Sequence, residues 1–295
     1  MTVEMFLGID GGGTNCRARL VDADGTVLGE GRAGPSNTTL GIDQAFGEIL
    51  KAAYAACDQA GLDKSTFSHT HAGFGLAGLP DGRDRNRLLN YPHPFASLAV
   101  NTDAHTACLG AHGGRNGGIV IFGTGSCGYA ILEGRGHNVG GWGFRLSDHA
   151  SGAWVGKRAV QAALQSFDGI LPPSTLAEDI MAEFANSAEQ AVIWAETARP
   201  VDYGAIAPKV VSRAESGDAL ARNLMLQAAE EATHLIQAVA AKGVAQIACL
   251  GGFFKYLSPW LPDKINHLLV TAKGDPLDGA IRMARNAQAE GNTNV

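Results

Sequence analysis

A glycine-rich hairpin near the start of the chain constrains the fold more than any other feature. Residues 6–31 read FLGIDGGGTNCRARLVDADGTVLGEG: an apolar strand ends in Asp10, a glycine run follows, and a second strand and a turn lead to a third strand. Because Gly11, Gly12 and Gly13 have no side chains, their backbone N–H groups can approach a phosphate closely. The segment therefore predicts a strand–phosphate loop–strand hairpin, with one carboxylate at its mouth to hold the metal ion that accompanies the phosphate.

The same pattern returns 112 positions later. Residues 118–134, GIVIFGTGSCGYAILEG, again contain an apolar strand, a turn of glycines and hydroxyls, and a strand. The alignment places Gly123 opposite Gly11 and Ser126 opposite Thr14, but the carboxylate of the first hairpin has no counterpart in the second. Glycine-rich hairpins also recur by chance in a chain with 39 glycines. Two hairpins in matching register favour a duplicated fold with two phosphate loops.

Composition limits the class of protein. A chain of 295 residues with 45% apolar and 18% charged residues is typical of a globular protein with room for two domains. The net charge of −6 and the lack of a lysine or arginine run argue against a nucleic-acid partner. Neither a signal peptide nor a membrane-spanning apolar run is recognisable, so we expect no membrane partner. Five scattered cysteines without a CxxC pair indicate reduced thiols in a cytoplasmic protein.

Helical and strand patterns predict an α/β chain of two lobes. We expect the first domain over residues 1–115 and the second over residues 116–295, with a glycine-rich hinge at 110–118. An alanine-rich helix is expected over residues 174–197. A last helix, over about 276–289, is placed so that it can pack back on the first lobe.

Asp103 is the candidate general base. In the segment VNTDAH, residues 100–105, a predicted strand ends just before this aspartate and a helix follows, so the carboxylate can take a proton from a substrate hydroxyl. The alternative is that Asp103 caps the helix. Asp148, which follows the glycine-rich segment 140–143, has the same two interpretations: it binds substrate hydroxyls, or it is an N-cap.

Two pairs of residues are further candidates. Ser36 and Asn37 lie in a polar loop, where the amide either binds a polar ligand or shapes a turn. Gly251 and Gly252 follow a buried strand and either admit a nucleotide base or form a tight strand-to-helix turn. The chain has no GxxxxGK[ST] element, which excludes a P-loop enzyme.

Together these motifs resemble the BadF/BadG/BcrA/BcrD-type ATPases of the sugar kinase/Hsp70/actin superfamily, and within them the bacterial glucosamine kinase and N-acetylglucosamine kinase branch. The resemblance implies an α/β, duplicated ribonuclease H-like (actin-like ATPase) fold with two lobes around a central nucleotide and sugar cleft. It also implies ATP-dependent phosphorylation of an aminosugar at its 6-hydroxyl, with glucosamine as the first choice and N-acetylglucosamine as the alternative. The markers are GIDGGGT (8–14), NTDA (101–104), FGTGS (122–126), GGWG (140–143) with Asp148, and LGG (250–252).

The resemblance further implies roles for single residues. Asp10 would hold Mg²⁺, through water, and Asp103 would be the catalytic base in a protein that forms a homodimer. The ATP-binding residues would be Gly11, Gly12, Gly13, Thr14, Gly123, Thr124, Gly125, Ser126, Gly251 and Gly252. The sugar-binding residues would be Ser36, Asn37, Asp103, Gly140, Gly141 and Asp148.

One position departs from the family pattern. The N-acetylglucosamine kinases carry an acidic residue and a glycine after the sugar-binding aspartate, whereas Asp148 is followed by His149 and Ala150. The motif therefore does not identify the residues beside the 2-substituent of the sugar, which is where the amine and the acetamide differ.

Two other classes share the implied fold. An ATP-driven electron-transfer activator needs paired cysteines for an iron–sulfur cluster, and the second lobe has only Cys127 and Cys249. A non-catalytic sugar sensor usually adds a DNA-binding module, and no basic helix–turn–helix precedes the first hairpin. The presence of both Asp10 and Asp103 also favours catalysis.

Overall fold

The computed structural model describes residues 4–79 and 82–293, and the chain divides into two compact units. The first comprises Met1–Gly117, Glu133–Gly136 and Thr271–Val295, and the second comprises Gly118–Leu132 and His137–Val270. The last helix, which the expected boundaries group with the second domain, therefore lies in the first unit by its contacts.

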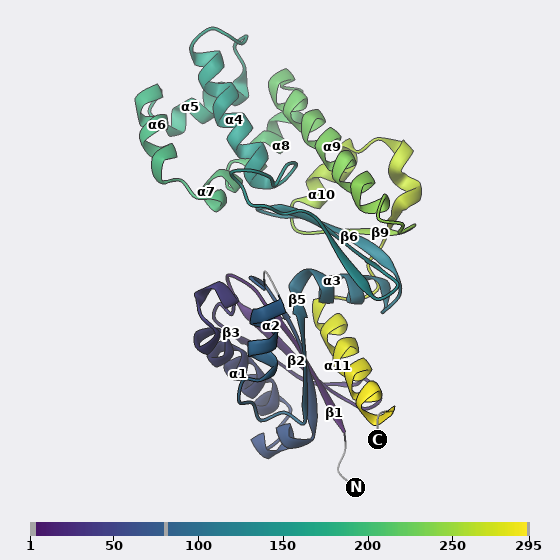
Figure 1. The fold of residues 1–295 in the computed structure, drawn as a ribbon. Helices are drawn as coiled ribbons and strands as arrows, with labels where there is room; N and C mark the ends of the chain where they lie inside the picture. Colours follow the sequence, from purple (N-terminus) through teal and green to yellow (C-terminus); the bar gives the residue numbers. More distant parts are fainter. Residues whose placement is uncertain (1–3, 80–81, 294–295) are drawn as a thin grey trace. The chain divides into compact units, whose positions relative to one another are not determined.

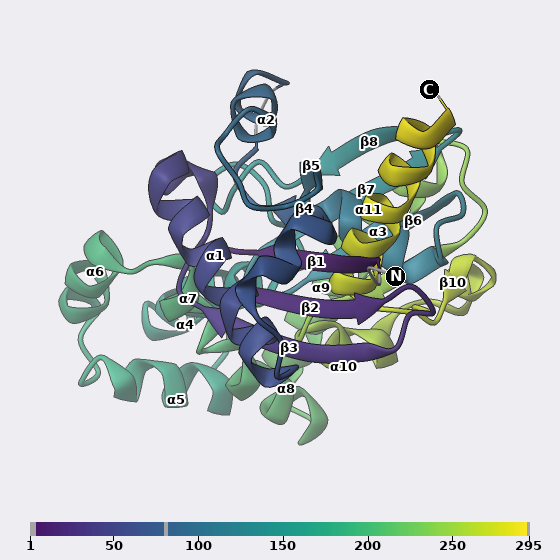
Figure 2. The same cartoon turned by 90° about the horizontal axis from the view of Figure 1, so that it is seen from below.

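The first unit is a five-stranded sheet with helices on both faces (Figures 1 and 2). The strand order is β3-β2-β1-β4-β5; β2 is antiparallel to β1 and β3, whereas β4 is parallel to β1 and β5. The strands are β1 (Met5–Gly11), β2 (Cys16–Asp22), β3 (Val27–Ala33), β4 (Thr70–Leu76) and β5 (Ser97–Thr102). The helices are α1 (Ile42–Gln59), α2 (Gly82–Leu89), α3 (Asp103–His112), α11 (Pro276–Thr293) and the 3₁₀ helices η1 (Thr38–Leu40) and η2 (Lys64–His69).

Alternation along β1 sends its side chains into two different cores. Leu7 and Ile9 pack in a cluster with Phe46 of α1, whereas Phe6 packs with Ile281 of α11. Successive side chains of a strand point to opposite faces of the sheet. One face of β1 is therefore covered by a helix close to it in the sequence, and the other by the last helix of the chain.

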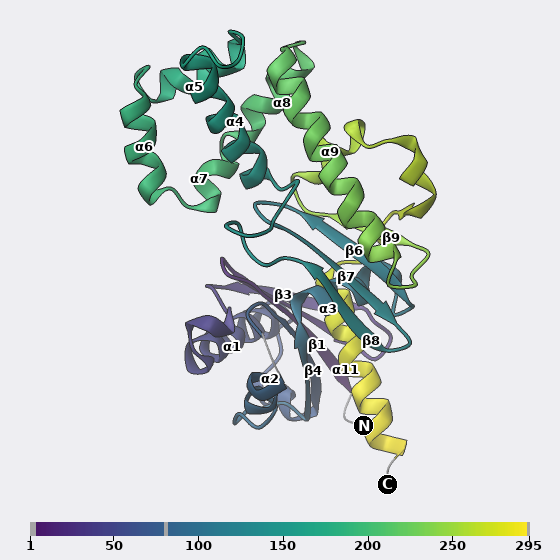
Figure 3. The same ribbon diagram turned by 45° about the horizontal axis from the view of Figure 1, so that its top comes forward.

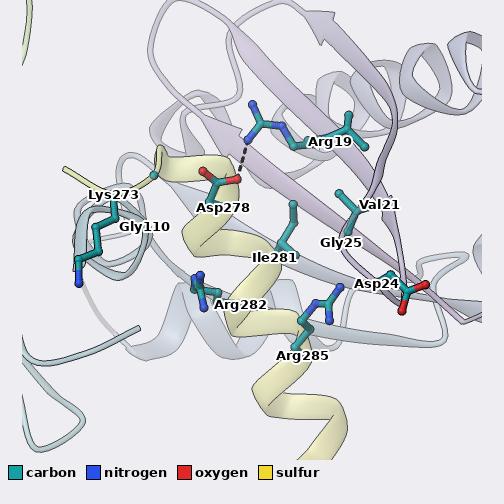
Figure 4. Close-up of a pocket in the computed structure, with 12 residues that line it drawn as sticks. Arg19, Val21, Asp24, Gly25, Gly110, Lys273, Asp278, Ile281, Arg282 and Arg285 are labelled. Atoms are coloured by element: carbon teal, nitrogen blue, oxygen red, sulfur yellow. Dashed lines mark hydrogen bonds and ion pairs between the residues drawn. The ribbon is translucent and has the colours of Figure 1, made fainter. Parts of the chain in front are cut away.

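Glycine lets α11 lie directly against the sheet. A Cβ atom on Gly73 of β4 would lie 2.0 Å from the carbonyl oxygen of Ala280. At the start of α11, Arg19 of β2 forms ion pairs with Asp275 (3.0 Å) and Asp278 (2.8 Å), the second of which is drawn in Figure 4. Close backbone packing and these two partly exposed ion pairs together hold α11 against the sheet of the first unit.

The second unit repeats the strand order of the first. Its sheet has the order β10-β9-β6-β7-β8, with β9 parallel to both β6 and β10. Both sheets thus place three consecutive strands beside two later ones, which confirms the duplicated α/β fold. The strands are β6 (Gly117–Phe122), β7 (Ser126–Leu132), β8 (Arg135–Gly140), β9 (Ile247–Leu250) and β10 (Leu269–Val270).

Helices form most of the second unit. Helix α9 lies along the sheet (Figure 3) and contributes Ala228, Ala232, Ile236 and Val239 to a core shared with Phe122 of β6. None of the described helices is long and apolar enough to span a membrane. The helices are α4 (Gly152–Phe167), α5 (Thr175–Glu183), α6 (Ala188–Thr197), α7 (Pro200–Gly204), α8 (Ala207–Glu215), α9 (Ala219–Ala240), α10 (Phe254–Leu257), η3 (Ser258–Trp260) and η4 (Asp263–Leu268).

The expectation of a single helix over residues 174–197 is wrong. Two helices, α5 and α6, occupy this stretch, because Ala185 and Asn186 adopt φ angles of 52° and 55°. A residue in this left-handed conformation ends a helix, and glycine usually supplies it. No glycine stands here to mark the break in the sequence.

Candidate active site

The first predicted phosphate loop joins β1 to β2. The N–H of Ser36 donates to the carbonyl oxygen of Gly12 at 3.0 Å, and this hydrogen bond ties the loop to the segment that follows β3. A Cβ atom on Gly11 would lie 2.5 Å from Ser36 Oγ, so that position requires glycine, whereas at Gly13 the nearest described atom would be 3.9 Å away. Gly13 and Thr14 are exposed. This half of the loop can therefore present N–H and hydroxyl groups to a phosphate.

Asp10 is held by an arginine on the facing strand. Nε and Nη2 of Arg17 donate to Asp10 Oδ2 at 3.0 and 2.5 Å, and the two residues are direct cross-strand partners. Among the described residues, no group of three or more His, Cys, Asp or Glu side chains is arranged to hold a metal ion. Mg²⁺ usually keeps several waters and takes other oxygens from substrate phosphates, so a single carboxylate is a suitable contact for it.

Asp103 lies in the first turn of α3 but does not cap it. The N-cap is Thr102, whose Oγ1 accepts the N–H of His105 at 3.2 Å, so the alternative role for Asp103 is wrong. Its own Oδ1 accepts the N–H of Ala104 at 2.8 Å. Burial raises the pKa of the Asp103 carboxyl, and the charge of Asp10 adds to the rise, although backbone N–H groups oppose it. A carboxylate with a raised pKa accepts a proton more readily, as a general base must.

Ser36 and Asn37 differ in what they can offer a ligand. The Ser36 side chain is fully buried between the Cys16 thiol and Gly11, so it packs against the first loop and is not exposed to a ligand. Asn37 Oδ1 caps η1 by accepting from the N–H and Oγ1 of Thr39 at 2.9 and 2.8 Å. No hydrogen bond to another described residue engages Asn37 Nδ2, so this group is the one that can donate to a polar ligand.

The second predicted phosphate loop, residues 123–125, joins β6 to β7 and is shorter than the first. Ser126 is the first residue of β7; its side chain is buried, and its Oγ donates to the carbonyl oxygen of His149 at 2.6 Å. Thr14, its partner in the sequence alignment, is instead exposed within a loop. Thr124 is the exposed hydroxyl of the second loop.

The start of α4 fixes the second loop. The N–H groups of Gly152 and Ala153 donate to the carbonyl oxygens of Gly123 and Thr124 at 2.8 and 3.2 Å. These N–H groups are among those that a helix leaves unpaired at its first turn. The carbonyl groups of the second loop thus pair with the free N–H groups at the start of α4, and these hydrogen bonds in turn fix the geometry of the loop.

Asp148 also lies near a helix start without capping it. Ser151 is the N-cap of α4, so the N-cap interpretation of Asp148 is wrong. Asp148 has a φ of 60°, and its carboxylate accepts backbone N–H groups of Gly143 and Ser126. A Cβ atom on Gly125 would lie 2.7 Å from its Oδ2. Burial raises the pKa of Asp148. A half-buried carboxylate on a left-handed residue, set against the second loop, is typical of a functional position.

Two adjacent glycines lie at the end of β8, the last residue of the strand and the one after it. Gly140 and Gly141 have φ angles of 66° and 74°, which glycine adopts without strain. A Cβ atom on Gly141 would lie 2.7 Å from Cys127 Cβ. The backbone of this pair is therefore pressed against β7, at the end of the sheet that carries the second loop.

The predicted adenosine glycines have separate reasons for being glycine. Gly251 has a φ of 94°, and a Cβ atom there would lie 2.3 Å from the carbonyl oxygen of Phe122, so the fold requires it. Gly252 is exposed, and no described atom lies within 4 Å of where its Cβ would be. Gly252 is thus the member of the pair that leaves space for a ligand.

Two neighbours of the predicted residues were not expected. Arg17 could have been found from the hairpin register, since it faces Asp10 directly. Glu231 of α9 lines a pocket of about 230 Å³ together with Gly140 and Gly141. No local signal marks it, because α9 is distant from these glycines in the sequence.

Another pocket lies apart from these residues. It has a volume of about 310 Å³ and opens beside Arg19 of β2, Lys273 and Arg282, as Figure 4 shows. Among the described residues that line it, none is a predicted site residue. The site residues of the first unit gather instead at the opposite end of β2, around the loop that follows Gly11.

Several known proteins share much of this sequence and fold. Glucosamine kinase GspK of Vibrio cholerae is 38% identical over 279 residues, which cover 95% of each chain. An N-acetylmuramic acid/N-acetylglucosamine kinase of Clostridium acetobutylicum is 34% identical over 189 residues, 61% of this chain and 60% of that one. A solved structure from Chromobacterium violaceum, provisionally named an N-acetylglucosamine kinase, has a TM-score of 0.85 at 34% identity and covers 96% of this chain and 100% of that one.

The family assignment rests on nearly the whole chain. The BadF/BadG/BcrA/BcrD ATPase family matches residues 7–280, a span that holds every predicted site residue from Asp10 to Gly252. The match confirms the resemblance inferred from the motifs. The chain belongs to the BadF/BadG/BcrA/BcrD ATPase family.

Proposed function

We propose that this protein is an ATP-dependent glucosamine kinase that phosphorylates the 6-hydroxyl of the sugar. The observation that carries the proposal is Asp103: a partly buried carboxylate with a raised pKa, near the charge of Asp10, at the start of a helix that a different residue caps. A family of ATPases supplies the reaction type. The choice of glucosamine is supported by the 38% identity to GspK over 95% of both chains.

In this mechanism Asp103 accepts the proton of the 6-hydroxyl as the sugar oxygen forms a bond to the terminal phosphorus of ATP. The bond from that phosphorus to the bridging oxygen breaks, and ADP leaves. Exposed groups at Gly13, Thr14 and Thr124 would contact the phosphates. Mg²⁺, when bound near Asp10, would neutralise phosphate charge.

We propose that residues of the second unit, together with Asn37, bind the sugar and fix its orientation. Asp148 would accept hydrogen bonds from sugar hydroxyls, because its half-buried carboxylate lies against Gly125 of the second loop and near the backbone N–H groups of Gly143 and Ser126. Gly140 and Gly141 would let the ring approach the backbone closely. Asn37 Nδ2 would donate to a hydroxyl oxygen.

N-acetylglucosamine is the alternative substrate, and the Clostridium and Chromobacterium relatives bear that name in whole or in part. The electron-transfer class is not supported by the cysteines. An iron–sulfur cluster needs paired cysteines, and the second unit has only Cys127 and Cys249, with no CxxC pair.

We assign the protein to the cytoplasm. We also propose that it forms a homodimer. All five cysteines are free, in keeping with a reducing compartment. Light scattering on the purified protein would give twice the monomer mass of 30.6 kDa if the dimer assignment holds.

The test of the proposed function is a side-by-side measurement of kcat and KM for glucosamine, N-acetylglucosamine and glucose with saturating Mg²⁺ and ATP. The highest kcat/KM is expected for glucosamine. A clear preference for N-acetylglucosamine would move the assignment to the alternative. Absence of sugar-dependent ADP release with all three would overturn the kinase assignment itself.

A further inference from the structure

The pocket beside Gly140 and Gly141 lies wholly within the second unit. Its volume is about 230 Å³, below the roughly 300–1,000 Å³ typical of sites for drug-sized ligands. It can therefore take a sugar ring or one of its substituents, but not a nucleotide. The lining residues are Ser126, Gly140, Gly141, Ser147, His149, Glu231, His234, Leu235 and Ala238.

Glu231 is the only carboxylate among the described residues that line this pocket, and no lysine or arginine lines it. The side chain is half-buried, and no hydrogen bond or ion pair joins it to another described residue. A partly buried carboxylate without a partner favours a cationic ligand, because that ligand supplies the missing charge and hydrogen bonds.

The position of Glu231 relative to the glycines follows from the helix. A Cβ atom on Gly140 would lie 3.5 Å from Leu235 Cδ1, so this turn of α9 packs on the end of β8. Glu231 precedes Leu235 by four residues, and residues with this spacing share one face of a helix. The carboxylate therefore faces the same backbone that we assign to sugar binding.

We propose that Glu231 determines substrate specificity by accepting hydrogen bonds from the ammonium group of glucosamine. This inference rests on the proposed function and assigns the amine-binding side of the same site. An acetamide at this carbon is neutral and bulkier, so it gains nothing from the charge. A 2-hydroxyl can still donate one hydrogen bond, but it is not cationic.

The test is Glu231→Gln, which keeps the shape of the side chain and removes its charge. Glu230→Gln is the matched control, since the neighbouring Glu230 is exposed on the same helix and lies outside this pocket. Both variants and the wild type are assayed for kcat and KM with glucosamine and with glucose. Hydrogen bonds to charged groups lead us to expect a KM for glucosamine that is about ten- to a hundredfold higher in Glu231→Gln. The KM for glucose should change less than about twofold, and Glu231→Asp should recover part of the loss.

Two kinds of failure are distinguishable. If the wild type phosphorylates glucosamine but Glu231→Gln matches Glu230→Gln, or impairs glucosamine and glucose equally, the role of Glu231 is overturned while the proposed function stands. If the wild type does not phosphorylate glucosamine, the proposed function fails and the amine assignment fails with it.

Discussion

Asp103 and Asp148 each stand near the start of a helix, and in each case a hydroxyl residue caps that helix. Thr102 and Ser151 accept the N–H groups that an aspartate could have accepted. Both carboxylates are consequently available for other partners while burial raises the pKa of each. Local sequence alone does not separate the two roles, because Thr, Ser and Asp are all favoured caps.

Replacement of Asp103 by asparagine separates catalysis from stability. We expect kcat to fall about 10²- to 10⁴-fold, the usual range for loss of a general base. The same variant should unfold at an equal or higher temperature at neutral pH, because the amide does not carry the buried charge. Activity assays and thermal melts check this, with the exposed Asp58→Asn as control. Near-normal turnover of Asp103→Asn would move the base elsewhere.

The pH dependence follows from the direction of the Asp103 shift. The carboxyl must be ionised to act as a base, and its pKa lies above the ordinary value of about 3.9. As the pH falls through this raised pKa, kcat/KM should fall with it, at a higher pH than for an ordinary aspartate.

Lowering the pH has the opposite effect on the contribution of Asp103 to the free energy of unfolding. Because the folded state holds this proton more tightly than the unfolded state does, the destabilising contribution of Asp103 is present above the folded pKa and diminishes as the pH falls. A pH–rate profile checks the first statement. An acidic limb that persists unchanged in the residual activity of Asp103→Asn would contradict the assignment to this residue.

At the scale of elements, glycines decide how closely helices and strands approach. Gly110 of α3 and Gly279 of α11 bring the two helices into backbone contact: a Cβ atom on Gly279 would lie 1.8 Å from the carbonyl oxygen of Thr106. Backbone atoms cannot move aside as a side chain can. The contact between α3 and α11 therefore requires glycine.

We expect Gly279→Ala to destabilise the protein by about 1–3 kcal/mol or more, the typical cost of overpacking. Gly47→Ala is the control, since Gly47 is also helical but exposed, and no described atom lies within 4 Å of its Cβ position. That change should stabilise by about 0.5–1 kcal/mol through helix propensity. Urea denaturation followed by circular dichroism measures both. Equal stability of the two variants would mean that α3 and α11 can separate without cost.

The elements that the sequence predicts well are those with a local cause. The first hairpin was predicted because a glycine run between apolar strands admits few other structures; the role of its loop in binding phosphate stays a prediction. The division into α5 and α6 was missed because Ala185 and Asn186 adopt left-handed conformations without a glycine. Glu231 was missed as a site residue because packing, and not sequence proximity, brings α9 to Gly140.

At the scale of the molecule, the first unit is discontinuous: its sheet comes from the first part of the chain and one of its covering helices from the last. A chain that ends at residue 270 would leave Phe6 and Gly73 without the helix that covers them. The second unit, which does not include this helix, would keep its core.

We therefore expect this shortened chain to lose hydrogen-exchange protection in β1 and β4 but to retain a native tryptophan emission spectrum. Trp142, Trp154, Trp194 and Trp260 all lie in the second unit, so their emission reports on that unit alone. A chain ending at Ala289 is the control, since it keeps the turns of α11 that contact the sheet. Wild-type protection of β1 in the shorter chain would show that α11 is dispensable.

The discontinuity also sets an order of events during protein synthesis. Strands β1 to β5 are synthesised before the second unit, and α11 is synthesised after it. All of the second unit is synthesised in between, and domains fold as units while the chain grows. The second unit can thus reach its native state first, while one apolar face of strands β1 to β5 stays uncovered until α11 has been synthesised. The unit whose synthesis starts before the other is therefore completed after it.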